Sequence, residues 1–175
     1  MIAYETNAKR RDRQLGLVPA TDVDRAKDFY TDKAGFDLDV DHRAGDDFRV
    51  VQLTPPGSAC SISVGKGITK TAPGSVEGLH VVVTDIVAAR DELVGRGADV
   101  GEIFHFGESG QAPGPHPERA DHGAFASFSD PDGNTWVLGG QPKRDGRVTR
   151  PVEPTDDIAA AIAGYERAFA ALTER

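Results

Sequence analysis

Histidine is the side chain in this sequence best suited to transfer a proton near neutral pH, and His80 is the most promising of the histidines. It lies in the strand-like run GLHVVV, two residues after Gly78, so both residues face the same side of the strand. On a concave surface its imidazole could orient a ligand or act as an acid or base. The alternative is a core histidine satisfied by a backbone carbonyl, and the sequence leaves both open.

Three further histidines have weaker claims to chemistry. His105 alternates with Phe104 and Phe106, so either the imidazole or the two aromatic rings face inward, and periodicity does not decide between them. His116 and His122 lie in a long loop, where exposure to solvent is expected. The spacing of these residues does not define a site by itself.

Composition excludes several classes of partner. The 175 residues carry 20 basic and 28 acidic side chains, and a net charge of −8 repels nucleic acids and anionic membrane surfaces. The single cysteine, Cys60, cannot form an internal disulfide, and no apolar run approaches the roughly 18 residues of a membrane span. The N-terminus is polar and charged. A soluble cytoplasmic protein with a small, neutral or cationic partner is expected.

The elements that must position these residues form an internal repeat. LGLVPATDVDRAKDFYTDKAGF and GLHVVVTDIVAARDELVGRGADV each combine a short strand, an aspartate and a helical pattern. Asp22 and Asp85 are expected N-caps, and Gly35 and Gly97 are expected to end the helices. Three strand candidates follow each helix, and the first one after the second helix is ADVGEIFHF, which begins at residue 98. The prediction is an α+β protein with two β-α-β-β-β modules.

The predicted organisation has five parts. In chain order they are an N-terminal extension (1–14), a first module (15–66), a second module (77–140), a linker (141–154) and a C-terminal amphipathic helix (155–175). That helix is expected to pack either on its own chain or across a dimer. The stretch GESGQAPGPHPERADH is too rich in glycine, proline and charge for a strand, so it is interpreted as a binding loop or a surface hairpin.

The motifs TDVDRAKDFYTDKAGF, TDIVAARDELVGRGADV and SDPDGNTWVL resemble those of the vicinal oxygen chelate superfamily. That superfamily includes glyoxalase I, bleomycin-resistance proteins, fosfomycin-resistance enzymes and extradiol dioxygenases. The resemblance implies two modules whose curved sheets enclose a cavity, usually with help from a second subunit.

In members that use a metal, the resemblance implies four ligand positions. They fall here on Leu15, Ser61, Gly78 and Val137. None of these supplies imidazole, carboxylate or thiolate, which divalent metals require. A metal-independent protein without a cofactor is therefore expected.

Strand alternation around those positions defines the expected cavity wall. Trp136 has the opposite parity to Val137 and is expected in the core or an interface. The predicted ligand-binding residues are mostly apolar, with a few polar groups: Leu15, Leu17, Gln52, Ser61, Ser63, His80, Phe106 and Val137.

The predicted function is binding of a small organic molecule, such as a hydrophobic or aromatic natural product or an antibiotic, for sequestration or resistance. The alternative is an enzyme of the same superfamily, of lyase, isomerase or dioxygenase type. It would use His80 as acid or base, or a relocated metal site built from residues such as His80, His105 and Glu102. A homodimer is expected, because sheet edges and half-built cavities need cover.

Overall fold

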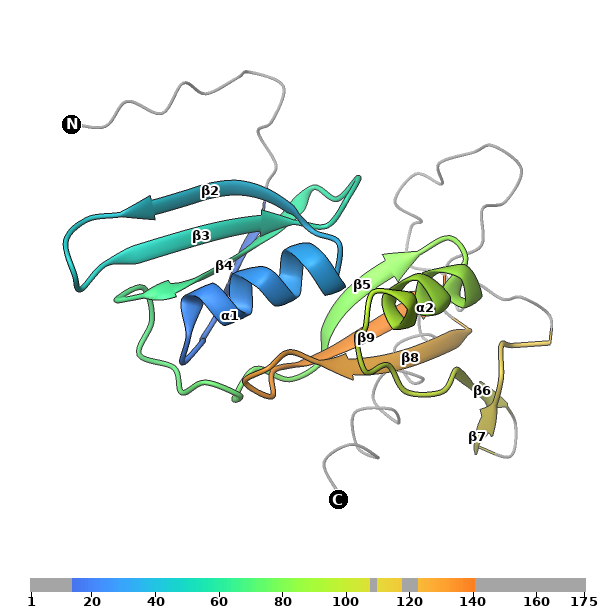
Figure 1. Ribbon diagram of the computed structural model, residues 1–175. Coiled ribbons are helices and arrows are strands. Elements are labelled where there is room, and N and C mark those ends of the chain that lie inside the picture. Colours follow the sequence, from blue (N-terminus) through green and yellow to red (C-terminus); the bar gives the residue numbers. More distant parts are fainter. Residues whose placement is uncertain (1–13, 108–109, 118–122, 141–175) are drawn as a thin grey trace. The chain divides into compact units, whose positions relative to one another are not determined.

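The computed structural model describes residues 14–107, 110–117 and 123–140 (Figure 1). The predicted linker and C-terminal helix, and all of the predicted N-terminal extension except Gln14, lie outside these residues. The chain divides into two compact units. The first runs through Glu77 and also includes Arg96–Ala98 and Ser129–Asn134, while the second takes the remainder. Each contains one mixed sheet, which confirms the α+β class.

The first unit contains a four-stranded sheet in the order β1-β4-β3-β2. Strands β1 and β4 are parallel, and the other neighbouring pairs are antiparallel. Its elements are β1 (Gln14–Val18), α1 (Val23–Asp28), a π-helical turn η1 (Phe29–Lys33), β2 (Asp37–Arg43), β3 (Arg49–Thr54) and β4 (Cys60–Lys66). The β-α-β-β-β order predicted for this half is confirmed.

Local capping explains where α1 begins. The carboxylate of Asp22 accepts hydrogen bonds from the backbone N–H groups of Asp24 and Arg25, at 3.0 and 3.1 Å, as an N-cap does. The helical segment ends at Gly35, whose φ of 71° suits glycine. Both caps were predicted, and both are confirmed.

Helix α1 covers one face of the first sheet (Figure 1). Ala26 and Tyr30 are completely buried on this side, together with Val51 and Leu53 of β3. Tyr30 stacks on Phe36 with ring centroids 5.5 Å apart. The core of this unit therefore lies between the sheet and α1.

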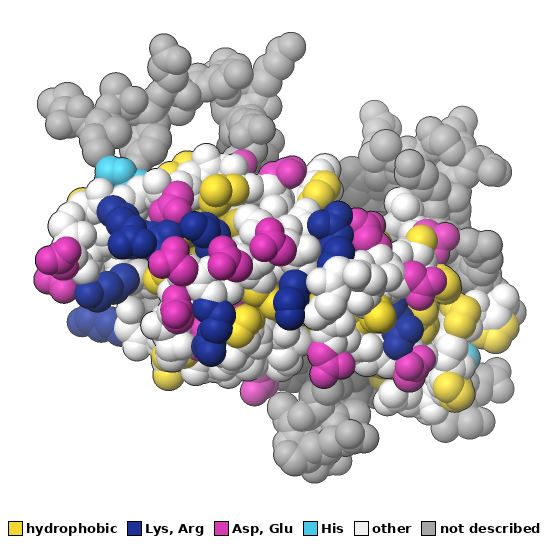
Figure 2. All heavy atoms as spheres, in the orientation of Figure 1, with side chains coloured by type: hydrophobic (Ala, Val, Ile, Leu, Met, Phe, Trp, Pro, Cys, Tyr) yellow, Lys and Arg dark blue, Asp and Glu magenta, His cyan; other side chains and the backbone are white. Residues whose placement is uncertain are grey.

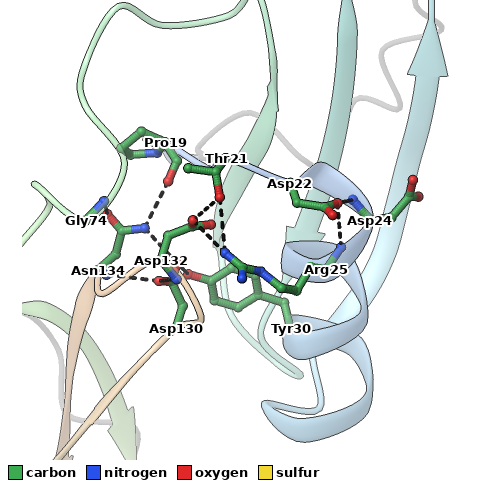
Figure 3. A network of polar contacts seen from close by, with 10 residues as sticks. All are labelled: Pro19, Thr21, Asp22, Asp24, Arg25, Tyr30, Gly74, Asp130, Asp132 and Asn134. Carbon is green, nitrogen blue, oxygen red and sulfur yellow. Dashed lines mark hydrogen bonds and ion pairs between the residues drawn. The ribbon is translucent and has the colours of Figure 1, made fainter.

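A polar network joins distant parts of the chain within the first unit (Figure 3). Asp130 is 5% exposed, and its carboxylate accepts from the Tyr30 hydroxyl at 2.8 Å and from the Asn134 side chain at 2.7 Å. The Asn134 amide also donates to the carbonyl of Pro19 at 2.9 Å. Asp130 closes the acidic turn through the backbone N–H groups of Asp132 and Asn134, and it joins the turn to η1 through Tyr30.

The second turn carboxylate, Asp132, extends this network. It accepts from Arg25 at 2.8 Å and from the Thr21 hydroxyl. Gly133, with φ of 93°, adopts the left-handed conformation that closes the turn. Three residues of the turn, Asp130, Asp132 and Asn134, therefore each bind residues between Pro19 and Tyr30.

The second unit contains a five-stranded sheet in the order β5-β9-β8-β6-β7. Its elements are β5 (Leu79–Val83), α2 (Ile86–Gly95), β6 (Phe104–Gly107), β7 (Gly110–Pro113), β8 (Ala124–Ser129) and β9 (Thr135–Gly140). The Asp85 side chain caps α2 by accepting from Val87 and Ala88, both at 3.1 Å, and Gly97 has a φ of 82°. These two caps are confirmed as well.

Two features of this unit differ from the sequence analysis. Strand β7 lies inside the glycine- and proline-rich stretch that was judged unsuitable for a strand. It lies at the edge of the described sheet beside β6, and an edge position tolerates Pro113. The strand expected from residue 98 begins only at Phe104, and Val100 before it forms an isolated bridge to Phe128.

Packing on the α2 side of the second sheet involves alternate residues of β9. Trp136 is 3% exposed and stacks on Phe128, with ring centroids 5.9 Å apart. A Cβ at Gly140 would lie 3.3 Å from Cβ of Ile86, so α2 approaches β9 closely there. The prediction that Trp136 lies in the core is confirmed.

The surface of the first unit carries mixed charge around one buried arginine. Figure 2 shows acidic and basic side chains intermixed over the region of α1 and β2. Arg49 has a side chain only 8% exposed, and it donates to both oxygens of Asp41 at 2.8 and 2.9 Å. It also pairs with Asp24 of α1 at 2.9 Å. The hydrogen bonds from Arg49 lower the pKa of Asp41 from 3.8 to about 2.

This pKa predicts an acid-sensitive contribution to stability. Because the folded-state pKa of Asp41 is depressed, its stabilisation is present above pH 3.8 and is lost as the pH falls toward 2. We expect Asp41→Asn to cost roughly 1 to 2 kcal/mol at pH 7. The cost should shrink between pH 4 and pH 2, as measured by urea unfolding across that range. Equal pH dependence in the wild type and in Asp41→Asn, with Asp46→Asn as the control, would contradict this assignment.

Among the described residues, no helix is long and apolar enough to cross a membrane.

Candidate ligand-binding site

The face of the first sheet opposite α1, called here the outer face, collects five of the residues predicted to bind a ligand. In the parallel pair β1 and β4, Leu15 lies beside Ser61 and Leu17 beside Ser63. Ser63 in turn lies opposite Gln52 of β3. Residues paired in this way share a face of the sheet. Strand alternation and register therefore bring these five residues together.

The outer face combines exposed apolar side chains with buried hydroxyls. Leu15 and Leu17 are 54% and 47% exposed, although leucine is usually buried. Beside them, Ser61 and Ser63 are only 3% and 1% exposed. This face thus exposes the two leucines, while the hydroxyl groups beside them are nearly buried.

The polar groups form a hydrogen-bonded row across three strands. The Thr54 hydroxyl donates to the carboxylate of Asp39 and lies 2.6 Å from the Ser61 hydroxyl. The Gln52 side chain donates to the same Asp39 oxygen at 3.2 Å. Asp39 and Thr54 were absent from the sequence-based set of site residues, although they hold two of its members in place.

Ser63 stands apart from this row. Its hydroxyl oxygen is buried and has no hydrogen-bond partner within the described part of the chain. Leaving such a group unsatisfied costs about 1 to 3 kcal/mol. An unsatisfied buried hydroxyl is a reason to look for a missing partner, and a bound molecule is one such partner.

A β-bulge in β2 explains why Asp39 was not predicted to lie on the outer face. Val40 lies opposite Gln52, and Leu38 lies opposite Leu53, so Asp39 is the extra residue. Without the bulge, Asp39 and Asp41 would share a face. With it, Asp39 binds Thr54 on the outer face, whereas Asp41 binds Arg49 on the α1 side.

The second unit has a corresponding face opposite α2. His80 pairs with Val137 across β5 and β9. Val137 and Gly140 lie on opposite faces of β9, and Gly140 faces α2. His80 is exposed there, so the alternative of a buried core histidine is wrong. The predicted neighbourhood of His80 and Val137 is observed within this unit.

The aromatic residues of β6 share the parity of that face. Phe104 and Phe106 lie with their rings 5.8 and 6.0 Å from the ring of Phe125. His105 points the other way, and its Nδ1 lies 2.9 Å from the carbonyl oxygen of Gly114. The sequence left open whether His105 or the two phenylalanines face the same side as Val137. In the structure the phenylalanines do.

The residues at the four positions where a metal was expected in metal-using members do not fit a metal. Leu15, Gly78 and Val137 offer no ligand atom, and the Ser61 hydroxyl is engaged with Thr54. His105 lies near His116, with ring centroids 5.4 Å apart. No group of three or more histidine, cysteine, aspartate or glutamate side chains suited to a metal occurs among residues 14–107, 110–117 and 123–140. His122 lies outside the described residues.

Comparison with known families agrees with this architecture. The model of the Glyoxalase/Bleomycin resistance protein/Dioxygenase superfamily matches residues 15–138. The chain therefore belongs to that superfamily.

Individual relatives narrow the comparison. The chain is 33% identical to TnmS3, an antibiotic binding protein from Streptomyces sp. CB03234, with 74% of this chain and 95% of that chain covered and a TM-score of 0.59. It is 34% identical to a glyoxalase/bleomycin resistance protein from the same organism, with coverage of 73% and 99% and a TM-score of 0.57. YetH of Bacillus subtilis (strain 168), described as uncharacterized, is 26% identical over 129 residues, which are 72% of this chain and 97% of YetH.

The described residues of the outer face provide three kinds of contact. These are apolar contact from Leu15 and Leu17, hydrogen bonding from the hydroxyls, and negative charge from Asp39. Such a combination is typical of small-molecule sites, in which apolar area supplies affinity and a few polar groups fix orientation.

Proposed function

We propose that this protein binds a small hydrophobic or aromatic organic molecule on the outer face of its first sheet, without a metal or other cofactor. The observation that carries the proposal is the arrangement of exposed Leu15 and Leu17 beside the nearly buried Ser61 and Ser63. Similarity to an antibiotic binding protein supports the same role. Sequestration of an antibiotic or a related natural product would follow from such binding alone.

Several finer features belong to the same proposal. Metal independence is supported by the unsuitable side chains at the four superfamily positions. A homodimer is supported by the exposed apolar residues of the first sheet, and a cytoplasmic location by the single cysteine. On the second sheet, His80, Val137 and Phe106 are proposed as further ligand contacts.

A matched pair of leucines tests the proposed face. Leu17 and Leu38 are 47% and 48% exposed, but Leu17 is on the outer face whereas Leu38 pairs with Leu53 of the core side. With 2-naphthol as a fluorescent aromatic probe, we expect Leu17→Asp to weaken binding about tenfold or more, because it buries a carboxylate against an apolar ring. Leu38→Asp should leave the affinity within about twofold.

Circular dichroism melting of both variants would check that each remains folded. Equal loss of probe affinity in the two variants, or no effect of Leu17→Asp, would remove the outer face from the binding site. Saturable binding of 2-naphthol that only the outer-face substitution weakens is the outcome that supports the proposal.

A second candidate function is an acid–base enzyme of the same superfamily that uses His80. The observation that favours it is the exposure of His80 beside Val137. If the protein turns over a bound compound, His80→Ala should reduce the rate about a hundredfold with little change in binding. A binder without catalysis would show unchanged compound after prolonged incubation.

A further inference from the structure

We infer that the ligand of the outer face carries a hydroxyl group, and that Asp39 imposes this requirement through Thr54. The inference rests on the proposed function and specifies the chemistry of the ligand at the same site. It follows from the order of protons along the hydrogen-bonded row and from the unsatisfied hydroxyl of Ser63.

Asp39 fixes the direction of every hydrogen bond in the row. A carboxylate only accepts, so the Thr54 hydroxyl must give its proton to Asp39. A threonine has one hydroxyl proton, so the 2.6 Å contact between Thr54 and Ser61 requires Ser61 to be the donor. The proton of Ser61 is then committed, and its oxygen can only accept from a further group.

Ser63 has the complementary need. It lies two residues along β4 from Ser61 and on the same face, at a Cα separation of about 6.6 Å. Its oxygen is buried without a partner in the described chain, so its proton is available to be donated. Ser61 therefore presents an acceptor, and Ser63 presents a donor.

A ligand hydroxyl satisfies both serines at once. It can donate to Ser61 and accept from Ser63, each at the usual distance of about 2.8 Å, which together span the gap between neighbouring outward side chains. An ether oxygen can accept from Ser63 but has no proton for Ser61. A carboxylate has the same defect, and its charge is repelled by Asp39 nearby.

The test compares three naphthalenes that differ only at one substituent: 2-naphthol, 2-methoxynaphthalene and 2-naphthoate. We expect the wild-type protein to bind 2-naphthol about three- to tenfold more tightly than 2-methoxynaphthalene, which is the effect of one net hydrogen bond. It should bind 2-naphthoate most weakly. Fluorescence titration at neutral pH measures all three.

Two variants should remove this preference by different means. Thr54→Val removes the hydroxyl to which Ser61 donates. The Ser61 proton is then free to be donated to the oxygen of an ether. Asp39→Asn replaces the carboxylate by an amide that can donate to the Thr54 hydroxyl. Thr54 can then donate to Ser61, which leaves the Ser61 proton free for the ligand. In both, the ratio of the 2-naphthol and 2-methoxynaphthalene affinities should fall below about twofold. Asp46→Asn, which removes the same charge from the exposed loop between β2 and β3, should keep the wild-type ratio.

The outcomes separate the inference from the proposed function. Equal wild-type affinity for 2-naphthol and 2-methoxynaphthalene, with both weakened by Leu17→Asp, would overturn the hydroxyl requirement and leave the binding face intact. A preference that persists in Asp39→Asn would also overturn the inference. Absence of saturable binding for all three probes would contradict the proposed function itself, and the inference with it.

Discussion

Asp130→Ala should lower the free energy of unfolding by about 3 to 5 kcal/mol. The carboxylate of Asp130 is nearly buried and accepts four hydrogen bonds, from the backbone N–H groups of Asp132 and Asn134 and from the side chains of Tyr30 and Asn134. Tyr30 and Asn134 are both completely buried. Truncation would leave their donors without an acceptor in a place that water reaches poorly.

Urea unfolding at pH 7 measures this effect, and Tyr30→Phe is the matched control. The control removes one of the four donors and leaves the turn closed, so its cost should be about 1 kcal/mol. A loss below about 1 kcal/mol for Asp130→Ala would mean that the network in Figure 3 contributes little to stability.

Gly65→Ala should be at least as damaging, with a loss of about 3 kcal/mol or more. Gly65 pairs with Val50 across β4 and β3, and a Cβ there would overlap the backbone carbonyl oxygen of Arg49. A backbone atom cannot rotate away as a side chain can. The two strands would have to separate, which would also disturb the ion pairs of Arg49.

Gly16→Ala is the control for this substitution. Gly16 is also a strand glycine of the first sheet, but its new methyl group would meet Ile62 Cγ2 at 3.9 Å, an ordinary contact. Its stability should stay within about 1 kcal/mol of the wild type. Similar urea midpoints for the two alanine variants would show that the sheet accommodates a methyl group at Gly65.

Local signals made most of the fold predictable. Asp22 and Asp85 cap helices through hydrogen bonds that reach only two or three residues along the chain, so their roles can be read without tertiary information. The strand β7 could not be predicted this way. Its pairing with β6 forms at a sheet edge, where Gly110 and Pro113 are tolerated despite their poor strand propensity.

The candidate site was predictable only as far as strand alternation extends. Alternation alone grouped Leu15 with Leu17 and Ser61 with Ser63, because β1 and β4 are regular. It failed for Asp39, because a bulge changes parity within β2 and nothing in DLDVDHR marks its position. Similarly, Thr54 closes the row through a side-chain contact with Ser61 that spacing does not indicate.

The central claim is that the outer face of the first sheet binds a small aromatic molecule, and intermolecular nuclear Overhauser effects test it most directly. The measurement uses methyl-labelled protein saturated with 2-naphthol. We expect cross-peaks from the ring protons of the probe to the methyl groups of Leu15 and Leu17. The methyl groups of Leu38 and Leu53, which belong to the opposite parity of the same sheet, should show none. Cross-peaks confined to Leu38, Leu53 or the second unit would contradict the account.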